Sequence, residues 1–171
     1  MKYIKRLTLA IFVTILSSGA IAADNSCPIQ ESLSKNQWIK VEEAFQAGKN
    51  DNLGYTMAAI TLVESKAGIH KINKVSESYG ITQININTAI KRMNMKDTPE
   101  NRKKVSKKLI NSDPLSFKLA REELLYWKKV RHNNWRNIVS SYNAGWKLAN
   151  GRNYLHKVIA NVRKLEACNL S

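Results

Sequence analysis

Proline and glycine are scarce in this chain, and no stretch of low complexity separates one part of it from another. The 171 residues include three prolines and seven glycines, and no internal repeat is present. A chain divided by flexible linkers would contain such stretches. Their absence predicts a single domain, and the length is sufficient for that domain to bury a real hydrophobic core.

Long apolar runs are also lacking, apart from one near the start. A basic segment, MKYIKR, precedes the apolar run LTLAIFVTIL, and SSGAIA then ends in a small-x-small pattern. This order predicts a secretory signal peptide over residues 1–22 and a mature domain over residues 23–171. The run is too short to span a bilayer. We therefore expect an exported, monomeric protein, periplasmic or secreted, that is not an integral membrane protein.

The two cysteines, Cys27 and Cys168, lie at opposite ends of the mature chain, and no Cys-x-x-Cys motif occurs. The histidines at 70, 132 and 156 are scattered, so the usual ligand spacings of a metal site are absent and we expect neither a metal nor a cofactor. In an oxidising compartment the cysteines can pair. Such a bridge would close a loop of about 140 residues and stabilise the domain by roughly 5 kcal/mol at most. The sequence leaves open whether it forms.

Acidic residues are few, at 13 against 28 basic ones, which gives a net charge of +15. Loss of residues 1–22 would remove Lys2, Lys5 and Arg6 but no acid, leaving +12. A domain this basic is expected to meet an anionic partner. Export argues against nucleic acid and favours an anionic polymer of the cell envelope, although a role of the lysines in solubility alone stays open.

Helical signals recur along the rest of the chain. SKNQ at 34–37 has the form of a capping box, and Trp38, Val41 and Phe45 share one helical face ahead of Gly48. A second helix is predicted from about residues 51–52 to Ser65. Further helices are predicted to begin at Thr98-Pro99 and at Asp113-Pro114, with Thr98 and Asp113 as N-caps and the prolines as first helical residues. Two more are predicted over 134–145 and 152–167.

The stretch 69–86 differs from these helices, because it is rich in β-branched residues, Asn and Ser. This composition indicates an irregular loop or a short β-hairpin. The predicted fold class is therefore mainly α, with an irregular or β-hairpin insert directly after the second predicted helix.

Glu64 ends an apolar run in AAITLVESKAG, residues 58–68. On a helix it would neighbour Ile60, Val63 and Ala67, beside the apolar face. Partial burial of a carboxyl raises its pKa above the ordinary value of about 4.3. A carboxyl that is protonated near neutral pH can act as a general acid. The alternative is a rim glutamate whose side chain reaches water.

Three blocks follow one another in the chain: LVESKAG (62–68), SESYGITQIN (76–85) and SSYNAGW (140–146). In this order they resemble the catalytic domain of the soluble lytic transglycosylase family, which has a lysozyme-like fold. The resemblance covers roughly residues 50–163 and includes DPLSFKLAREELLYW and NYLHKVIANV. The chain departs from the family at Ile81-Thr82, where the family has Leu-Met, and at Ser141, where it has Ala. The Met position usually helps to line the sugar cleft.

The resemblance implies one catalytic acid/base, Glu64, surrounded by residues that bind the substrate. Ser65 would orient the substrate, and Gln83 would contact an N-acetyl group or the sugar backbone. The Tyr142 hydroxyl would lie near Glu64, while Asn143 would shape the cleft and Tyr154 would line its far wall.

The implied activity is that of a peptidoglycan lytic transglycosylase, which cleaves the MurNAc-GlcNAc β-1,4 bond and leaves a 1,6-anhydro-MurNAc product. A hydrolytic lysozyme-type muramidase needs a second carboxylate. Glu77 is the acid closest to a motif, whereas Glu122 and Glu123 are expected at the surface or in ion pairs. A non-catalytic glycan-binding envelope protein is the third possibility.

The implied partners are peptidoglycan strands, held in part by the lysines near residues 96–108. Small members of the family often act beside a secretion, conjugation or pilus apparatus. The sequence does not choose between that role, wall recycling and a phage-borne role.

Overall fold

The computed structural model describes residues 27–170, so the expected signal peptide at 1–22 lies outside the described residues. The described part is mainly helical, with one small antiparallel sheet, as predicted. In order, the elements are α1 (Pro28–Glu31), α2 (Lys35–Lys49), α3 (Gly54–Ser65), β1 (Ile72–Asn73), β2 (Ser78–Tyr79), β3 (Ile84–Asn85), α4 (Ile86–Arg92), α5 (Pro99–Asn111), α6 (Asp113–Val130), α7 (Trp135–Ala144), the 3-10 helix η1 (Leu148–Gly151) and α8 (Arg152–Glu166).

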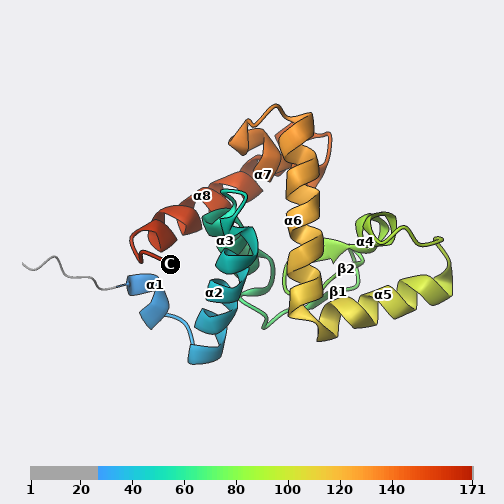
Figure 1. Ribbon diagram of the computed structural model, residues 1–171, viewed down its shortest axis with the longest axis horizontal. Helices are drawn as coiled ribbons and strands as arrows, with labels where there is room; N and C mark the ends of the chain where they lie inside the picture. Colours follow the sequence, from blue (N-terminus) through green and yellow to red (C-terminus); the bar gives the residue numbers. More distant parts are fainter. Residues whose placement is uncertain (1–26, 171) are drawn as a thin grey trace, which may run out of the picture.

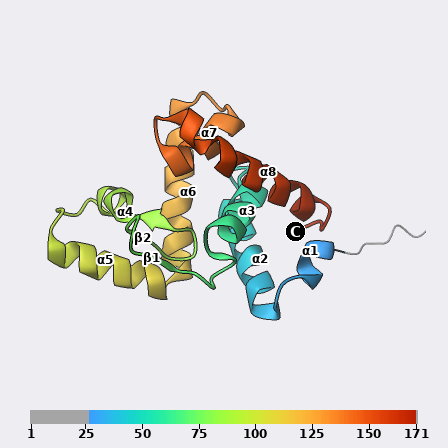
Figure 2. The ribbon, with the colours of Figure 1, turned by 180° about the vertical axis from the view of Figure 1, so that it is seen from behind.

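Helix α6 runs through the middle of the molecule and separates two groups of elements. Helices α1, α2, α3 and α8 lie on one side of it, and α4, α5 and the sheet lie on the other (Figure 1). The same division is visible from behind (Figure 2). Helix α7 lies near one end of α6 and leads through η1 into α8. A site between the two groups therefore draws residues from distant parts of the sequence.

The predicted helix caps are confirmed at α2 and α5. The Ser34 hydroxyl accepts a hydrogen bond from the Gln37 N–H at 3.3 Å, and the Gln37 side chain accepts one from the Ser34 N–H at 3.0 Å. The Thr98 side chain caps α5 in the same way, by accepting from the Asn101 N–H. These bonds satisfy backbone donors that have no partner within the helix.

Two predicted helix starts are wrong. Helix α6 is capped by the side chain of Ser112, and Asp113 is instead its first residue, whose carboxylate forms ion pairs with Lys40 and Lys71. Helix α3 begins at Gly54 and not near residues 51–52. Asn52 has a φ of 60°, which is left-handed and interrupts a right-handed helix before α3 starts.

The insert after α3 contains three short strands, one more than a hairpin. They pair in the order β1-β2-β3, all antiparallel, with Ile72 opposite Tyr79 and Tyr79 opposite Ile84. Asn85 ends β3 and caps α4 through a bond from the Asn87 N–H to its side chain. The chain thus passes directly from the sheet into a short helix that was not predicted.

Helix α3 lies in the core. Met57, Ala58, Ala59 and Ile60 are completely buried in succession, and α3 packs against α2 and α8. A helix that is apolar on all sides is stable only when its neighbours cover it. Its C-terminal end therefore carries Glu64 out of the core at a fixed position.

A disulfide joins Cys27 to Cys168, with the two Cα atoms 4.8 Å apart. The bridge ties the start of α1 to the residues just after α8. The two cysteines are therefore paired, which the sequence alone left open. None of the helices in the described part is both long and apolar enough to cross a membrane.

Candidate active site

Glu64 lies in a cleft of about 330 Å³ that receives residues from all three sequence blocks. The first block contributes Glu64, the second Gln83 and its neighbours, and the third Tyr142 and Asn143. The remaining lining residues are Asn73, Ser76, Ser78, Ile84, Asn85, Thr88 and Glu123. The walls are mainly polar side chains, which can donate hydrogen bonds to a polar ligand and accept them from it.

Glu64 occupies the last turn of α3 and is half-buried. Burial raises the pKa of its carboxyl from 4.5 to about 7, while the nearby Tyr154 hydroxyl and the positive charge of Lys157 oppose this shift. Loss of hydration outweighs both opposing effects because a charged carboxylate is poorly accommodated away from water. Glu64 is therefore substantially protonated near neutral pH.

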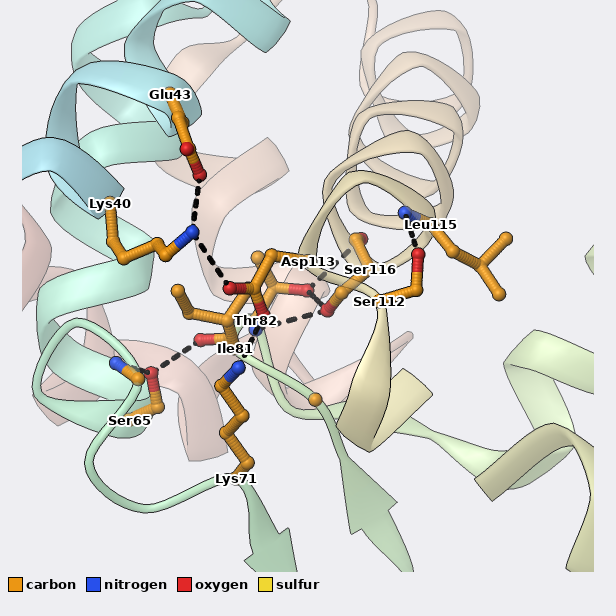
Figure 3. A network of polar contacts seen from close by, with 12 residues as sticks. Lys40, Glu43, Ser65, Lys71, Ile81, Thr82, Ser112, Asp113, Leu115 and Ser116 are labelled. Atoms are coloured by element: carbon orange, nitrogen blue, oxygen red, sulfur yellow. Dashed lines mark hydrogen bonds and ion pairs between the residues drawn. The ribbon is translucent and has the colours of Figure 1, made fainter. Parts of the chain in front are cut away.

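The expected direct role of Ser65 in orienting a substrate is not supported by its position. Its side chain is buried, and its hydroxyl donates to the Ile81 carbonyl at 2.6 Å and accepts from the Gly68 N–H at 2.8 Å (Figure 3). These bonds join the end of α3 to the second block. Ser65 thus positions the backbone beside Glu64 and does not reach the cleft.

Gln83 lines the cleft, as expected, and its side chain is fixed by backbone carbonyls. Its amide nitrogen donates to Gly80 at 2.9 Å and to His70 at 3.2 Å. Both bonds use the nitrogen, which leaves the amide oxygen for an N–H group of a bound molecule. This arrangement suits recognition of an N-acetyl group.

Thr82, at the position where the family has Met, is completely buried and turned toward α6. Its hydroxyl lies 2.7 Å from the Ser116 hydroxyl, and its N–H donates to the same oxygen at 3.2 Å (Figure 3). The family contact between this position and a sugar is therefore missing. In its place the chain has a polar connection between the second block and α6.

The Tyr142 hydroxyl donates to the Thr82 carbonyl at 2.9 Å. Burial raises the pKa of Tyr142 well above its ordinary value, and the negative charge of Glu64, with a smaller effect of Glu123, adds to this shift. Tyr142 consequently stays protonated, and its hydroxyl lies within the electrostatic reach of both carboxylates.

Tyr154 does not line the cleft as expected. It is buried, its ring is stacked on Tyr142 with centroids 6.4 Å apart, and its hydroxyl has no partner at hydrogen-bonding geometry among the described residues. That hydroxyl nevertheless lies close enough to Glu64 to lower the pKa of the carboxyl. Tyr154 therefore supports Glu64 from the protein interior.

Glu77, the expected second carboxylate, is also outside the cleft. Its side chain is 53% exposed and forms an ion pair with Arg102 at 3.1 Å. Its backbone φ of 49° is left-handed and lies in the turn before β2. The carboxylate that could serve a hydrolytic mechanism must therefore come from elsewhere.

Glu123 lines the cleft together with Glu64, although the sequence predicts it at the surface or in an ion pair. The ion pair is real: one Glu123 oxygen accepts from Arg92 Nε at 2.9 Å and from Nη2 at 2.7 Å. The side chain is only 12% exposed. A sequence signal existed, since Glu123 is four residues from buried Leu119 and from buried Trp127 and so adjoins the buried face of α6.

A second polar cluster supports the loop that follows α3. The Asp113 carboxylate binds Lys71 at 2.6 Å and Lys40 at 3.2 Å, and Lys40 also binds Glu43 (Figure 3). Asp113 is buried, so loss of its partners would leave an uncompensated charge. The cluster connects α2, the loop and α6.

Within residues 27–170, no group of three or more His, Cys, Asp or Glu side chains could hold a metal ion. The cleft offers a protonated carboxyl, a second carboxylate, amides and hydroxyls.

No protein-family model and no solved structure matches this chain. The chain is similar to a protein of Enterobacteria phage T4, named "Uncharacterized 20.7 kDa protein in vs-regB intergenic region". The two are 31% identical over 116 residues, which are 67% of this chain and 63% of the phage protein. The match thus covers less than two thirds of the phage protein, and its printed name states no activity.

Proposed function

We propose that this protein is a peptidoglycan lytic transglycosylase of lysozyme-like architecture. The observation that carries the proposal is that Glu64, with a pKa of about 7, shares one cleft with Gln83, Tyr142 and Asn143. These residues come from three separate blocks of sequence, and each block resembles the corresponding part of that family. A single protonated carboxyl at the centre of a polar cleft is what its chemistry requires.

In the proposed reaction, Glu64 donates its proton to the glycosidic oxygen between MurNAc and GlcNAc. The bond to that oxygen breaks as the MurNAc anomeric carbon becomes oxocarbenium-like. The 6-hydroxyl of the same MurNAc then attacks that carbon, and Glu64 takes up the hydroxyl proton. Because the nucleophile belongs to the substrate, its proximity replaces a water activated by a second carboxylate. Glu64 ends protonated, and the product is a 1,6-anhydro sugar.

A hydrolytic muramidase is the second candidate, and one observation favours it. Glu123 lines the same cleft as Glu64, so a carboxylate is available to activate water or to stabilise positive charge. Both Arg92 contacts fall on one Glu123 oxygen, which leaves the other without an Arg92 contact.

The mass of the products from purified cell-wall sacculi separates these candidates. A transglycosylase releases anhydro-muropeptides, each lighter by one water than the hydrolysis product. Release of muropeptides with a reducing end would instead identify a hydrolase, and Glu123→Gln would then lose activity as Glu64→Gln does. Binding without any release would indicate a non-catalytic glycan-binding protein.

The charge and the disulfide support an extracytoplasmic place of action. Helix α5 carries four exposed lysines suited to an anionic polymer such as the cell wall, namely Lys103, Lys104, Lys107 and Lys108. The disulfide between Cys27 and Cys168 is of the kind that persists in oxidising compartments. We extend the proposal to a periplasmic or secreted enzyme that opens the wall locally, beside a secretion, conjugation or pilus apparatus.

A further inference from the structure

Trp146 exposes 66% of its surface, although an indole ring is a large apolar group. It follows directly after Gly145, the C-cap residue of α7, and it belongs to the third sequence block. A single exposed aromatic side chain is common on protein surfaces, so Trp146 is informative because its position is fixed.

The Trp146 ring is held by contacts with the Arg131 guanidinium and the Trp127 indole. The Arg131 guanidinium lies 4.9 Å from the Trp146 ring and 5.2 Å from the Trp127 ring. The two indole rings meet edge to face with centroids 5.2 Å apart. Arg131 is itself held by bonds to the Ser141 hydroxyl at 2.9 Å and to the Gly145 carbonyl at 3.2 Å. The exposed part of the indole is thus held in place before any ligand arrives.

Two sets of neighbours connect Trp146 to residues that line the cleft. Along α6, its partner Trp127 lies one turn beyond Glu123, on the same helical face, and Glu123 lines the cleft. Along α7, Trp146 is three residues beyond Asn143, which also lines the cleft. Gly145 makes the turn between them with φ 59° and ψ −123°, a conformation that favours glycine.

We propose that Trp146 is a stacking platform for a pyranose ring of a glycan strand that extends past the cleft. The C–H face of an N-acetylated pyranose is apolar and can cover an indole, while its hydroxyl and amide groups stay at the ring edge. Asn143 and Glu123, which line the cleft, would offer an amide and a carboxylate to such polar groups. This subsite rests on the proposed function, since it assumes that the cleft binds glycan.

The test uses the disulfide-bonded protein with Glu64→Gln, which prevents turnover, and chitotetraose as the probe. Trp146→Ala is expected to weaken chitotetraose binding about tenfold, as truncation of an aromatic anchor commonly does. Trp146→Phe should restore most of the affinity because a flat aromatic face remains. Ile69→Ala is the matched control, since Ile69 is 58% exposed but lies outside the cleft, and it should bind as the parent does.

Digestion of sacculi by variants with an intact Glu64 gives the kinetic readout. Trp146→Ala is expected to raise KM while leaving kcat nearly unchanged, because the platform is remote from the reacting bond. A loss of folding would lower kcat as well, and unfolding curves of the same samples would reveal it. A folded Trp146→Ala protein that binds chitotetraose and digests sacculi like the wild type would overturn the subsite but leave the proposed function intact.

The same measurements can also uphold the subsite while they contradict the proposed catalytic function. If the wild type releases no muropeptides but binds chitotetraose through Trp146, the subsite stands and the proposed catalytic function fails. If the wild type binds no glycan at all, both are overturned, and capture of a protein by this face would be the remaining explanation for the exposed indole.

Discussion

The Tyr142 hydroxyl donates a 2.9 Å hydrogen bond to the carbonyl oxygen of Thr82 and thereby joins the third sequence block to the second. Thr82 is in turn bound to Ser116 on α6, and Ser65 at the end of α3 binds the neighbouring carbonyl of Ile81. Two consecutive carbonyls of the second block therefore receive bonds from the first and the third. This arrangement fixes the cleft around Glu64 without using the carboxyl itself.

Glu64→Gln is expected to reduce cleavage of sacculi by at least about 100-fold, because the general acid is lost while the size of the side chain is kept. The folded-state pKa of Glu64 is raised from 4.5 to about 7. The contribution of Glu64 to stability is therefore fully present below pH 4.5, and up to about 3 kcal/mol of it is lost as the pH rises from there through 7.

The glutamine variant should lack this pH-dependent loss. Urea unfolding gives the free energy of unfolding of both proteins at pH 5 and at pH 8. The difference between wild type and variant should change between the two pH values, and contributions from other titrating groups cancel in that difference. Equal pH dependence in the two proteins would contradict the assigned pKa, and undiminished cleavage would contradict the catalytic role.

Tyr154→Phe is expected to move the alkaline limb of the pH–activity profile upward. In the wild type, kcat/KM should fall above a pKa of about 7, where Glu64 loses its proton. The Tyr154 hydroxyl lowers the pKa of Glu64, so its removal raises that pKa further. Tyr55→Phe is a suitable control, because Tyr55 lines a pocket that shares no residue with the cleft. A profile that stays in place or moves downward would argue against this contact.

Gly80→Ala is expected to destabilise the protein far more than Gly145→Ala. Both glycines have positive φ values, of 83° and 59°, so alanine is strained at either position, at about 1 to 3 kcal/mol. At Gly80, however, a Cβ would lie 2.6 Å from the Ser116 hydroxyl and 2.8 Å from the Leu109 carbonyl, whereas nothing lies within 4 Å at Gly145. Thermal unfolding of the two variants isolates the steric cost, and similar midpoints would show that the second block can move away from α6.

Reduction of the bridge between Cys27 and Cys168 is expected to lower the unfolding temperature markedly. The cysteines are 141 residues apart, so the closed loop spans nearly the whole domain, and its release costs up to about 5 kcal/mol in the chain-entropy model. The double variant Cys27→Ser with Cys168→Ser should match the reduced wild type. Its unfolding should not respond to reductant, and a response would point to an effect of the reagent unrelated to the bridge.

Replacing the four exposed lysines of α5 by glutamine is expected to weaken binding to sacculi at low salt and to flatten its salt dependence. The variant changes Lys103, Lys104, Lys107 and Lys108. A matched control changes four exposed lysines elsewhere, namely Lys35, Lys66, Lys118 and Lys164. Equal losses in the two variants would mean that net charge, and not α5, attracts the wall.

Residues close together in the sequence supplied most of the correct predictions. The capping box at Ser34 and Gln37, the cap at Thr98 and the end of α7 at Gly145 all depend on contacts within a few residues. The start of α6 was misplaced by one residue because Ser112 and Asp113 are both good caps. Only the ion pairs of Asp113 with Lys40 and Lys71, from distant elements, show which of the two remains free to cap.

By itself, the sequence determined that the fold is mainly helical and that a carboxyl ends an apolar helix, because helical periodicity and capping are local properties. The tertiary structure alone decided which side chains meet that carboxyl. It placed Glu123 in the cleft and Glu77 outside it, and it turned Ser65 and Tyr154 toward the interior. The physical reason is that residues of α4, α6 and α7 reach the cleft at the end of α3 only after packing. Burial, and with it the pKa of Glu64, therefore depends on neighbours that are distant in the chain.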